Sequence, residues 1–279
     1  MTSPTESAAL GVTIRGSRGS VAVSSPKTVR YGGHTTCVEI DRPDVRIIVD
    51  AGSGLLERVR NQPDDDKPTL LLMTHLHWDH VLGFPFYSPL YREGWSLEVQ
   101  GVPREGRSVL DELLSINKPP LFPVSLKDAI RAKVTGTDLA PTGEAQFGDV
   151  RYRWTEVSHP GGCSAFRFDW PGASLVVSGD VELASQKSAG LRELAQGVDV
   201  LICDAQYTQQ EYESRRGWGH STNLQAAALA REAGVGRLVM THHDPLHDDV
   251  FIDEMVDEAR QVFPRTDAAW YQMRLLNEP

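Results

Sequence analysis

The chain has 279 residues, of which 40% are hydrophobic and 24% charged, the ordinary range for a globular protein. No apolar run approaches the roughly 20 residues of a membrane span, and the start MTSPTESAAL lacks the pattern of a secretory signal. With 28 Lys+Arg against 38 Asp+Glu, the formal net charge is −10. Such a chain repels long polyanions, so tRNA or DNA is disfavoured as a partner, whereas a small anion held by a metal is compatible.

The first half of the chain is dominated by short strands, after residues 1–10, which we expect to be disordered. Predicted strands cover residues 12–19, 35–40, 45–52, 69–74 and 96–101, and predicted helices cover residues 53–61 and 106–117. The second helix is stopped by the proline pair at 119 and 120.

The second half begins with a strand meander and then alternates helices with strands. The meander covers residues 150–159, 163–170 and 174–180; helices are predicted at 191–197, 222–234 and 250–263, and strands at 199–205, 236–243 and 268–276. This order predicts an α/β protein in which two packed sheets are covered by helices outside. Without an internal repeat or a clear linker, residues 11–279 are predicted to form a single domain.

The three cysteines, Cys37, Cys163 and Cys203, are an odd number at wide spacing, with no CxxC pair. This usage indicates reduced thiols and a cytoplasmic protein rather than a disulfide framework.

The stretch THLHWDH, Thr74 to His80, places three histidines and one aspartate within six positions behind the apolar run PTLLLM. A core histidine usually occurs alone, so this density at the end of a buried strand indicates ligands around a metal. Other histidines and aspartates also stand at the ends of predicted strands: His159, Asp180, Asp204, His242 and His243. Strand ends over a rigid scaffold are where sites usually lie.

THLHWDH resembles the HxHxDH signature of the metallo-β-lactamase superfamily, and the later strand-end residues follow in the order of that superfamily's remaining ligands. The resemblance implies a four-layer αββα sandwich with two divalent metal ions. It assigns His75, His77 and His159 to one metal, Asp79, His80 and His242 to the other, and Asp180 to a bridge between them. His242 is preferred to His243 because the family places its last ligand directly after the strand.

Imidazoles and carboxylates suit zinc, manganese or iron, and zinc is the favoured metal. Behind or beside the ligands we expect Asp50, Asp204, His243 and Trp78, which orient ligands or face the substrate.

The segment GWGHSTNLQAAALA resembles the part of ribonuclease Z and its relatives in which a histidine before Ser-Thr opens a helix. The resemblance makes His220 a general acid, which together with Asp79 forms the expected catalytic pair. In the alternative interpretation Ser221 or Thr222 only caps the following helix, and His220 faces solvent.

The chain departs from ribonuclease Z because His159 and Asp180 are only 21 positions apart (180 − 159), which leaves no room for the tRNA-binding arm of that family. We therefore expect hydrolysis of a small phosphodiester, cyclic ones included, by a metal-bridging hydroxide. A carboxylic ester, lactone or thioester hydrolase with the same site is the alternative. Relatives imply a homodimer.

The insertion from Pro103 to Val134 is the longest near the predicted site. Its apolar residues, such as Leu121 and Phe122, together with Trp78 and Phe86, either wall a partly apolar substrate pocket or belong to the core.

Overall fold

The computed structural model describes residues 11–61 and 66–276. Residues 1–10, predicted to be disordered, lie outside the described part. The assignment of residues 11–279 to one domain stays a prediction.

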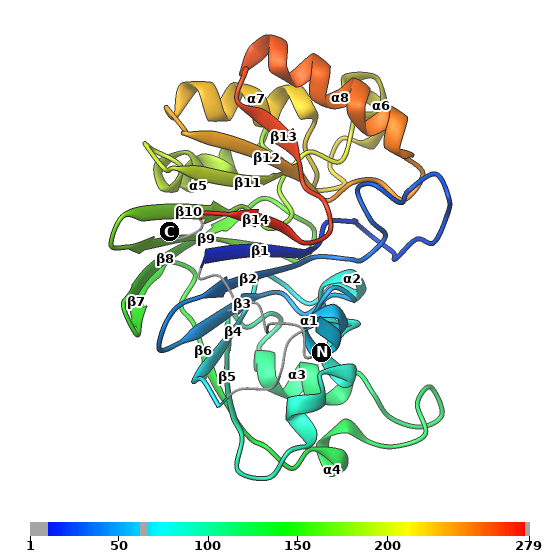
Figure 1. The fold of residues 1–279 in the computed structure, drawn as a ribbon, viewed down its shortest axis with the longest axis vertical. Helices are drawn as coiled ribbons and strands as arrows, with labels where there is room; N and C mark the ends of the chain where they lie inside the picture. The colour runs from blue at the N-terminus through cyan, green and yellow to red at the C-terminus, as the bar shows by residue number, and fades with distance from the viewer. Residues whose placement is uncertain (1–10, 62–65, 277–279) are drawn as a thin grey trace, which may run out of the picture.

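The first sheet has seven strands in the order β14-β1-β2-β3-β4-β5-β6 (Figure 1). Their bounds are Gly11–Gly16 for β1, Cys37–Asp41 for β2, Arg46–Val49 for β3, Thr69–Met73 for β4, Ser96–Gly101 for β5, Lys133–Asp138 for β6 and Met273–Leu275 for β14. Strands β3 to β6 run parallel, and β14, β1, β2 and β3 pair antiparallel. Every residue of β3 and β4 is buried, as expected for strands covered on both faces.

The second sheet also has seven strands, in the order β13-β12-β11-β10-β9-β8-β7. Their bounds are Gly143–Phe147 for β7, Val150–Val157 for β8, Cys163–Trp170 for β9, Ala173–Val177 for β10, Val200–Asp204 for β11, Arg237–Thr241 for β12 and Thr266–Ala268 for β13. The meander β7 to β10 is antiparallel, and β10 to β13 run parallel.

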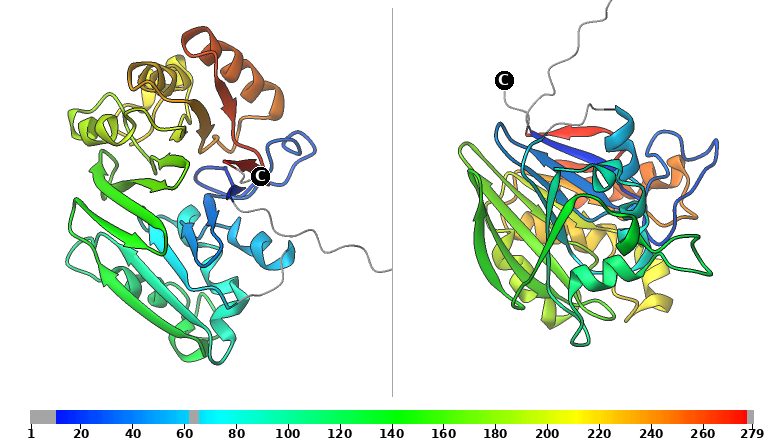
Figure 2. Two further views of the ribbon diagram at one scale, coloured as in Figure 1. Left: turned by 60° about the vertical axis from the view of Figure 1, so that its left-hand side comes forward. Right: turned by 90° about the horizontal axis from the view of Figure 1, so that it is seen from below.

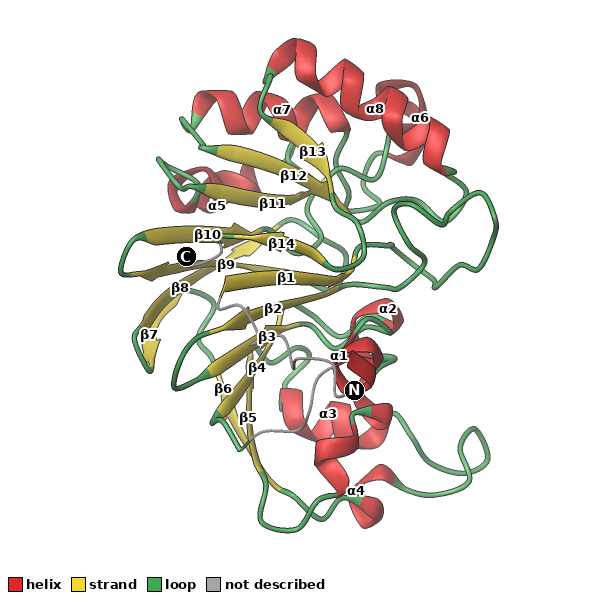
Figure 3. Ribbon diagram, in the orientation of Figure 1, coloured by secondary structure: helices red, strands yellow, loops and turns green. Residues whose placement is uncertain are grey.

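The helices lie on the outer faces of the two sheets (Figures 1 and 3). Beside the first sheet are α1 (Leu55–Asn61), α2 (Trp78–Val81), α3 (Val109–Ser115) and α4 (Leu126–Ala129); beside the second are α5 (Ala189–Leu194), α6 (Gln209–Arg215), α7 (Asn223–Glu232) and α8 (Asp249–Val262). Short 3-10 turns occupy Phe84–Phe86, Ser88–Tyr91 and Gln186–Ser188. After a turn of the molecule about the vertical axis, the yellow and orange helices still lie at one end and the cyan segment toward the other (Figure 2, left).

Three apolar cores hold these four layers together. The central core packs one sheet on the other through residues such as Ile40, Leu70 and Phe166. A second core joins the second sheet to α5, α7 and α8, and a third joins the first sheet to its own helices. The predicted αββα sandwich is therefore confirmed. No helix among the described residues combines the length and apolar character needed to cross a membrane.

The prediction of one strand over residues 268–276 is wrong. The chain leaves the second sheet at Ala268, turns through Trp270 and Gln272, and re-enters as β14 in the first sheet. Gln272 has a φ of 63°, which ends any continuous strand there. The apolar pattern of this segment is the same whether it serves one sheet or two, so sequence periodicity did not reveal the crossing.

Candidate metal centre

Polar side chains gather where strands of both sheets end. The stretch THLHWDH follows β4 directly, and its last residues begin the one-turn helix α2. His159, Asp180 and His242 follow closely on β8, β10 and β12. The two sheets thereby bring together side chains from distant parts of the chain, at the kind of scaffold edge that carries sites.

The first compact group contains His75, His77, His159 and Asp180, each of which offers one ligand atom within 4.8 Å of the others. Nδ1 of His77 lies 3.0 Å from Nε2 of His159. Nε2 of His75 lies 3.5 Å from Oδ2 of Asp180. The group unites the three histidines expected around one metal with the expected bridging carboxylate.

The second group contains Asp79, His80, Asp180 and His242, again with ligand atoms within 4.8 Å. Nε2 of His242 lies 3.1 Å from Oδ2 of Asp79 and 3.2 Å from Oδ2 of Asp180. The backbone N–H of Ser20 donates to Oδ2 of Asp79 at 2.7 Å, a contact that the sequence did not predict. Asp180 therefore belongs to both groups.

The residues present fit bound cations. Among the residues that the structure describes, the Nε2 atoms of His75 and His80 are buried and have no hydrogen-bond partner. Such a buried polar atom costs about 1–3 kcal/mol when it is left unsatisfied. One cation in each group would satisfy these nitrogens, and the set of imidazoles and carboxylates suits zinc, manganese or iron.

Asp50 lies behind the second group and orients His80. Its Oδ2 is 2.7 Å from Nδ1 of His80, and its Oδ1 accepts hydrogen bonds from the backbone N–H and the hydroxyl of Thr74. Both the Asp50 and His80 side chains are fully buried. With Nδ1 engaged, only Nε2 of His80 remains to bind an ion, which is the orienting role expected of Asp50.

Two further orienting contacts were missed by the sequence reasoning. Oε1 of Gln206 lies 3.0 Å from Nδ1 of His242, and the carbonyl oxygen of Gly219 lies 2.9 Å from Nδ1 of His159. Gly219 has a φ of +89°, and a Cβ atom there would lie 2.3 Å from His159 Nδ1. The second glycine of GWGHST, Gly219, was the sequence signal for this close approach between the backbone and His159.

His220 lies against the second group, on the side of the second sheet. Its Nδ1 is 2.8 Å from Oδ2 of Asp204, and its ring stacks on that of His242 with centroids 4.7 Å apart. Thr222 does cap α7, accepting from the backbone of Gln225. His220 nevertheless does not face solvent, because only 8% of it is exposed.

His243 and Trp78 lie outside both groups. Nε2 of His243 bonds the carbonyl oxygen of Ala269 at 2.9 Å, and burial lowers the pKa of this histidine to about 3, so the ring is neutral. Trp78 begins α2 and is exposed beside His77. Their proposed contacts with ligands or substrate stay predictions.

The two groups differ in their electrostatics. Desolvation of the ring lowers the pKa of His75, His77 and His159, although part of His77 is exposed to solvent, and this favours the neutral imidazole that binds metals. Burial opposes protonation of His80 and His242 too, but Asp180 and the neighbouring carboxylates raise the pKa of both rings above the ordinary value. Carboxylate charge thus concentrates on the second group, where it would attract a cation.

The αββα sandwich with His/Asp groups along its strand ends is the metallo-β-lactamase fold. The chain belongs to the corresponding family, since the model described as "Beta-lactamase superfamily domain" matches residues 45–243. YhfI from Bacillus subtilis, a metallo-beta-lactamase fold protein, superposes with a TM-score of 0.73 at 20% identity, over 94% of this chain and 96% of that one. The short form of human tRNase Z gives 0.71 at 18% identity, over 97% and 100%.

Among curated relatives, ribonuclease Z of Brevibacillus brevis is 39% identical over 103 residues. That match covers 36% of this chain but only 31% of the relative, so the chain matches less than a third of that protein's length. The predicted resemblance to the ribonuclease Z branch is thereby confirmed.

Proposed function

We propose that the chain is a metal-dependent hydrolase with two divalent cations, zinc foremost, acting on a small phosphodiester. The observation that carries the proposal is the pair of His/Asp groups sharing Asp180, in which the Nε2 atoms of His75 and His80 have no hydrogen-bond partner among the described residues. Ribonuclease Z, as its name states, acts on RNA, which is itself a phosphodiester.

In this proposal His75, His77 and His159 would hold one cation and Asp79, His80 and His242 the other, and Asp180, which belongs to both groups, would help to hold each. Two cations there would activate water at neutral pH and offset charge on a phosphoryl group. Asp50 and Gln206 fix the rings of His80 and His242 through their Nδ1 atoms. Zinc is favoured over manganese or iron only by the donor set.

The proton chemistry falls to the chain's own residues. Asp204 engages Nδ1 of His220, which leaves Nε2 to deliver a proton to the leaving oxygen. Asp79, whose Oδ2 accepts a hydrogen bond from the backbone N–H of Ser20, would serve as a ligand and would orient the nucleophilic water by accepting a hydrogen bond from it. A donor matters most for a phosphodiester, because an alkoxide is a poor leaving group.

A small substrate is favoured over tRNA by the net charge of the chain and by the short distance in sequence between His159 and Asp180. Residues 159–180 are taken up by the turn after β8, by β9 and by β10, within the second sheet. The net charge of −10 also opposes a long polyanion. The buried free thiols of Cys37, Cys163 and Cys203 support a cytoplasmic location, and the homodimer stays a proposal.

The test is metal content by elemental analysis, run on one preparation with hydrolysis of bis(p-nitrophenyl) phosphate and of a lactone and thioester panel. About two metals per chain with preferential diester turnover supports the proposal. Two metals with turnover only of carbonyl esters overturns the phosphodiester assignment and favours the ester, lactone or thioester alternative. A preparation that binds no divalent metal overturns the proposal that the chain is a metal-dependent hydrolase.

A further inference from the structure

A cavity of about 300 Å³ opens beside the first His/Asp group. It lies between the loop after β5, the helix α3 and the turn after His159. Its lining residues are His75, Leu76, His77, Arg104, Glu105, Arg107, Glu112, Gly161 and Gly162. The apolar residues expected to form a pocket wall do not line it, and Leu121 is 83% exposed. The wall next to the candidate metal ligands therefore carries two arginines and two glutamates.

Arg104 is the inner cation of this wall. Its guanidinium lies close to Gly162, where a Cβ atom would come within 2.6 Å of Nη1. Nη1 pairs with Glu156, Nη2 is 3.4 Å from the hydroxyl of Ser164, and Nε has no partner among the described residues. The strands β8 and β9 thus hold Arg104 in place without using all of its donors.

Arg107 is the outer cation, and its partners are exchangeable. Its side chain is 59% exposed, and it pairs at 3.1 Å with Glu105 and with Glu112. Exposed ion pairs of this kind contribute little to stability, on the order of 0–1 kcal/mol. A carboxylate or phosphate of a ligand can therefore replace either glutamate at little cost.

We infer that the substrate carries a second anionic group, a carboxylate or a phosphate, which Arg104 and Arg107 bind while the scissile diester lies at the His/Asp groups. This inference rests on the proposed function and deepens it by naming the substrate class. Guanidinium groups bind such oxyanions through paired N–H donors in a fixed plane. In the free protein, Glu105 and Glu112 pair with Arg107, and a neutral substituent of the substrate cannot replace these carboxylates as its partner. An anionic substituent can accept charge-assisted hydrogen bonds from both Arg104 and Arg107.

The experiment compares p-nitrophenyl phosphodiesters that differ only in the second ester group: ethyl, 2-carboxyethyl or 2-phosphonoethyl. For the metal-loaded wild type we expect kcat/KM to be about tenfold or more higher for an anionic ester than for the ethyl ester, as charge-assisted hydrogen bonds imply. The carboxyl and phosphonate arms show which of the two anions the site takes.

Two variants and one control assign the preference to its residues. Arg107→Met and Arg104→Met are expected to reduce the anionic-to-ethyl ratio toward one. Arg107 is exposed, so its variant keeps the test valid if Arg104→Met disturbs the turn at Gly162. The control is Arg192→Met, an exposed arginine paired with Glu232, which should keep the wild-type ratio.

The outcomes separate this inference from the proposed function. Equal turnover of all three esters by the wild type overturns the second-anion inference and leaves the phosphodiesterase proposal standing. A preference that survives both arginine substitutions overturns the assignment to this cavity. Failure to hydrolyse any of the three esters at full metal loading overturns the proposed function instead.

Discussion

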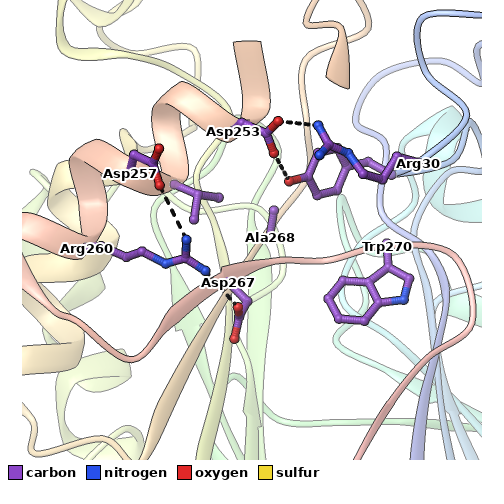
Figure 4. Close-up of a pocket in the computed structure, with 9 residues that line it drawn as sticks. Arg30, Asp253, Asp257, Arg260, Asp267, Ala268 and Trp270 are labelled. Atoms are coloured by element: carbon purple, nitrogen blue, oxygen red, sulfur yellow. Dashed lines mark hydrogen bonds and ion pairs between the residues drawn. The ribbon is translucent and has the colours of Figure 1, made fainter. Parts of the chain in front are cut away.

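The candidate metal centre and the cavity beside α8 both gather charged side chains, but the side chains in the two regions differ in their hydrogen bonding. The cavity near α8 has a volume of about 490 Å³ and is lined by Arg30, Tyr31, Asp253, Val256, Asp257, Arg260, Asp267, Ala268 and Trp270. Figure 4 shows Arg260 between Asp257 and Asp267, and Arg30 beside Asp253. The hydroxyl of Tyr31 also donates to Asp253 at 2.7 Å. Acids and bases there bind one another.

In the candidate metal centre the same kind of crowding leaves two buried imidazole nitrogens without a hydrogen bond. Nε2 of His75 and Nε2 of His80 are buried and unsatisfied among the described residues, whereas no side chain lining the α8 cavity is in that state. The difference teaches that a cluster of charges does not by itself indicate a site. Buried groups that the fold orients but does not satisfy are what indicate a ligand.

The largest effect is expected from His77→Ala. His77 is exposed, so its removal should leave folding nearly unchanged while it takes one ligand from the first group. Metal content should fall below that of the wild type, and turnover should be lost with it. Elemental analysis and diester hydrolysis on the same preparation measure both. Full metal content together with full activity would remove His77 from the site.

His220→Ala should separate binding from chemistry. The variant keeps the residues proposed as ligands, so metal content should stay at the wild-type value. Loss of a general acid should lower kcat by about 10²–10⁴-fold for diesters with poor leaving groups, and much less for p-nitrophenyl esters. Unchanged turnover of an unactivated diester would reduce His220 to a residue that packs on His242.

Asp50→Ala should lower metal affinity, although Asp50 is not itself one of the proposed ligands. It leaves Nδ1 of His80 and the N–H of Thr74 without their buried acceptor, so metal affinity should fall by about 10–100-fold. The apo protein should also lose about 1–3 kcal/mol of unfolding free energy. Metal titration and denaturant unfolding measure the two effects. An unchanged metal affinity would show that Asp50 serves the fold alone.

Much of the metal centre could be predicted from sequence because its residues stand at strand ends in a recognisable order. Apolar runs placed β4, β8, β10 and β12, and their alternation with helices predicted two packed sheets with helices outside. The resemblance to the metallo-β-lactamase superfamily implied the four-layer sandwich. Gln206 and the carbonyl of Gly219 could not be predicted as orienting groups, because their roles depend on which loops meet in space. The edge strand β7 was missed for a different reason: its residues are largely exposed, and its apolar alternation consists of only two residues, Ala145 and Phe147.

The smallest effect is expected in the α8 cavity. Asp257→Asn removes one partner of Arg260, which keeps its contacts with Asp267 and with the carbonyl oxygen of Thr266. Because the Asp257 side chain is 75% exposed, the unfolding free energy should change by no more than about 0.5 kcal/mol. Metal content and turnover should equal those of the wild type, in contrast to His77→Ala. If Asp257→Asn instead lowered turnover at constant stability, the internally paired cavity would have a functional role, and unsatisfied buried atoms would no longer distinguish the two regions.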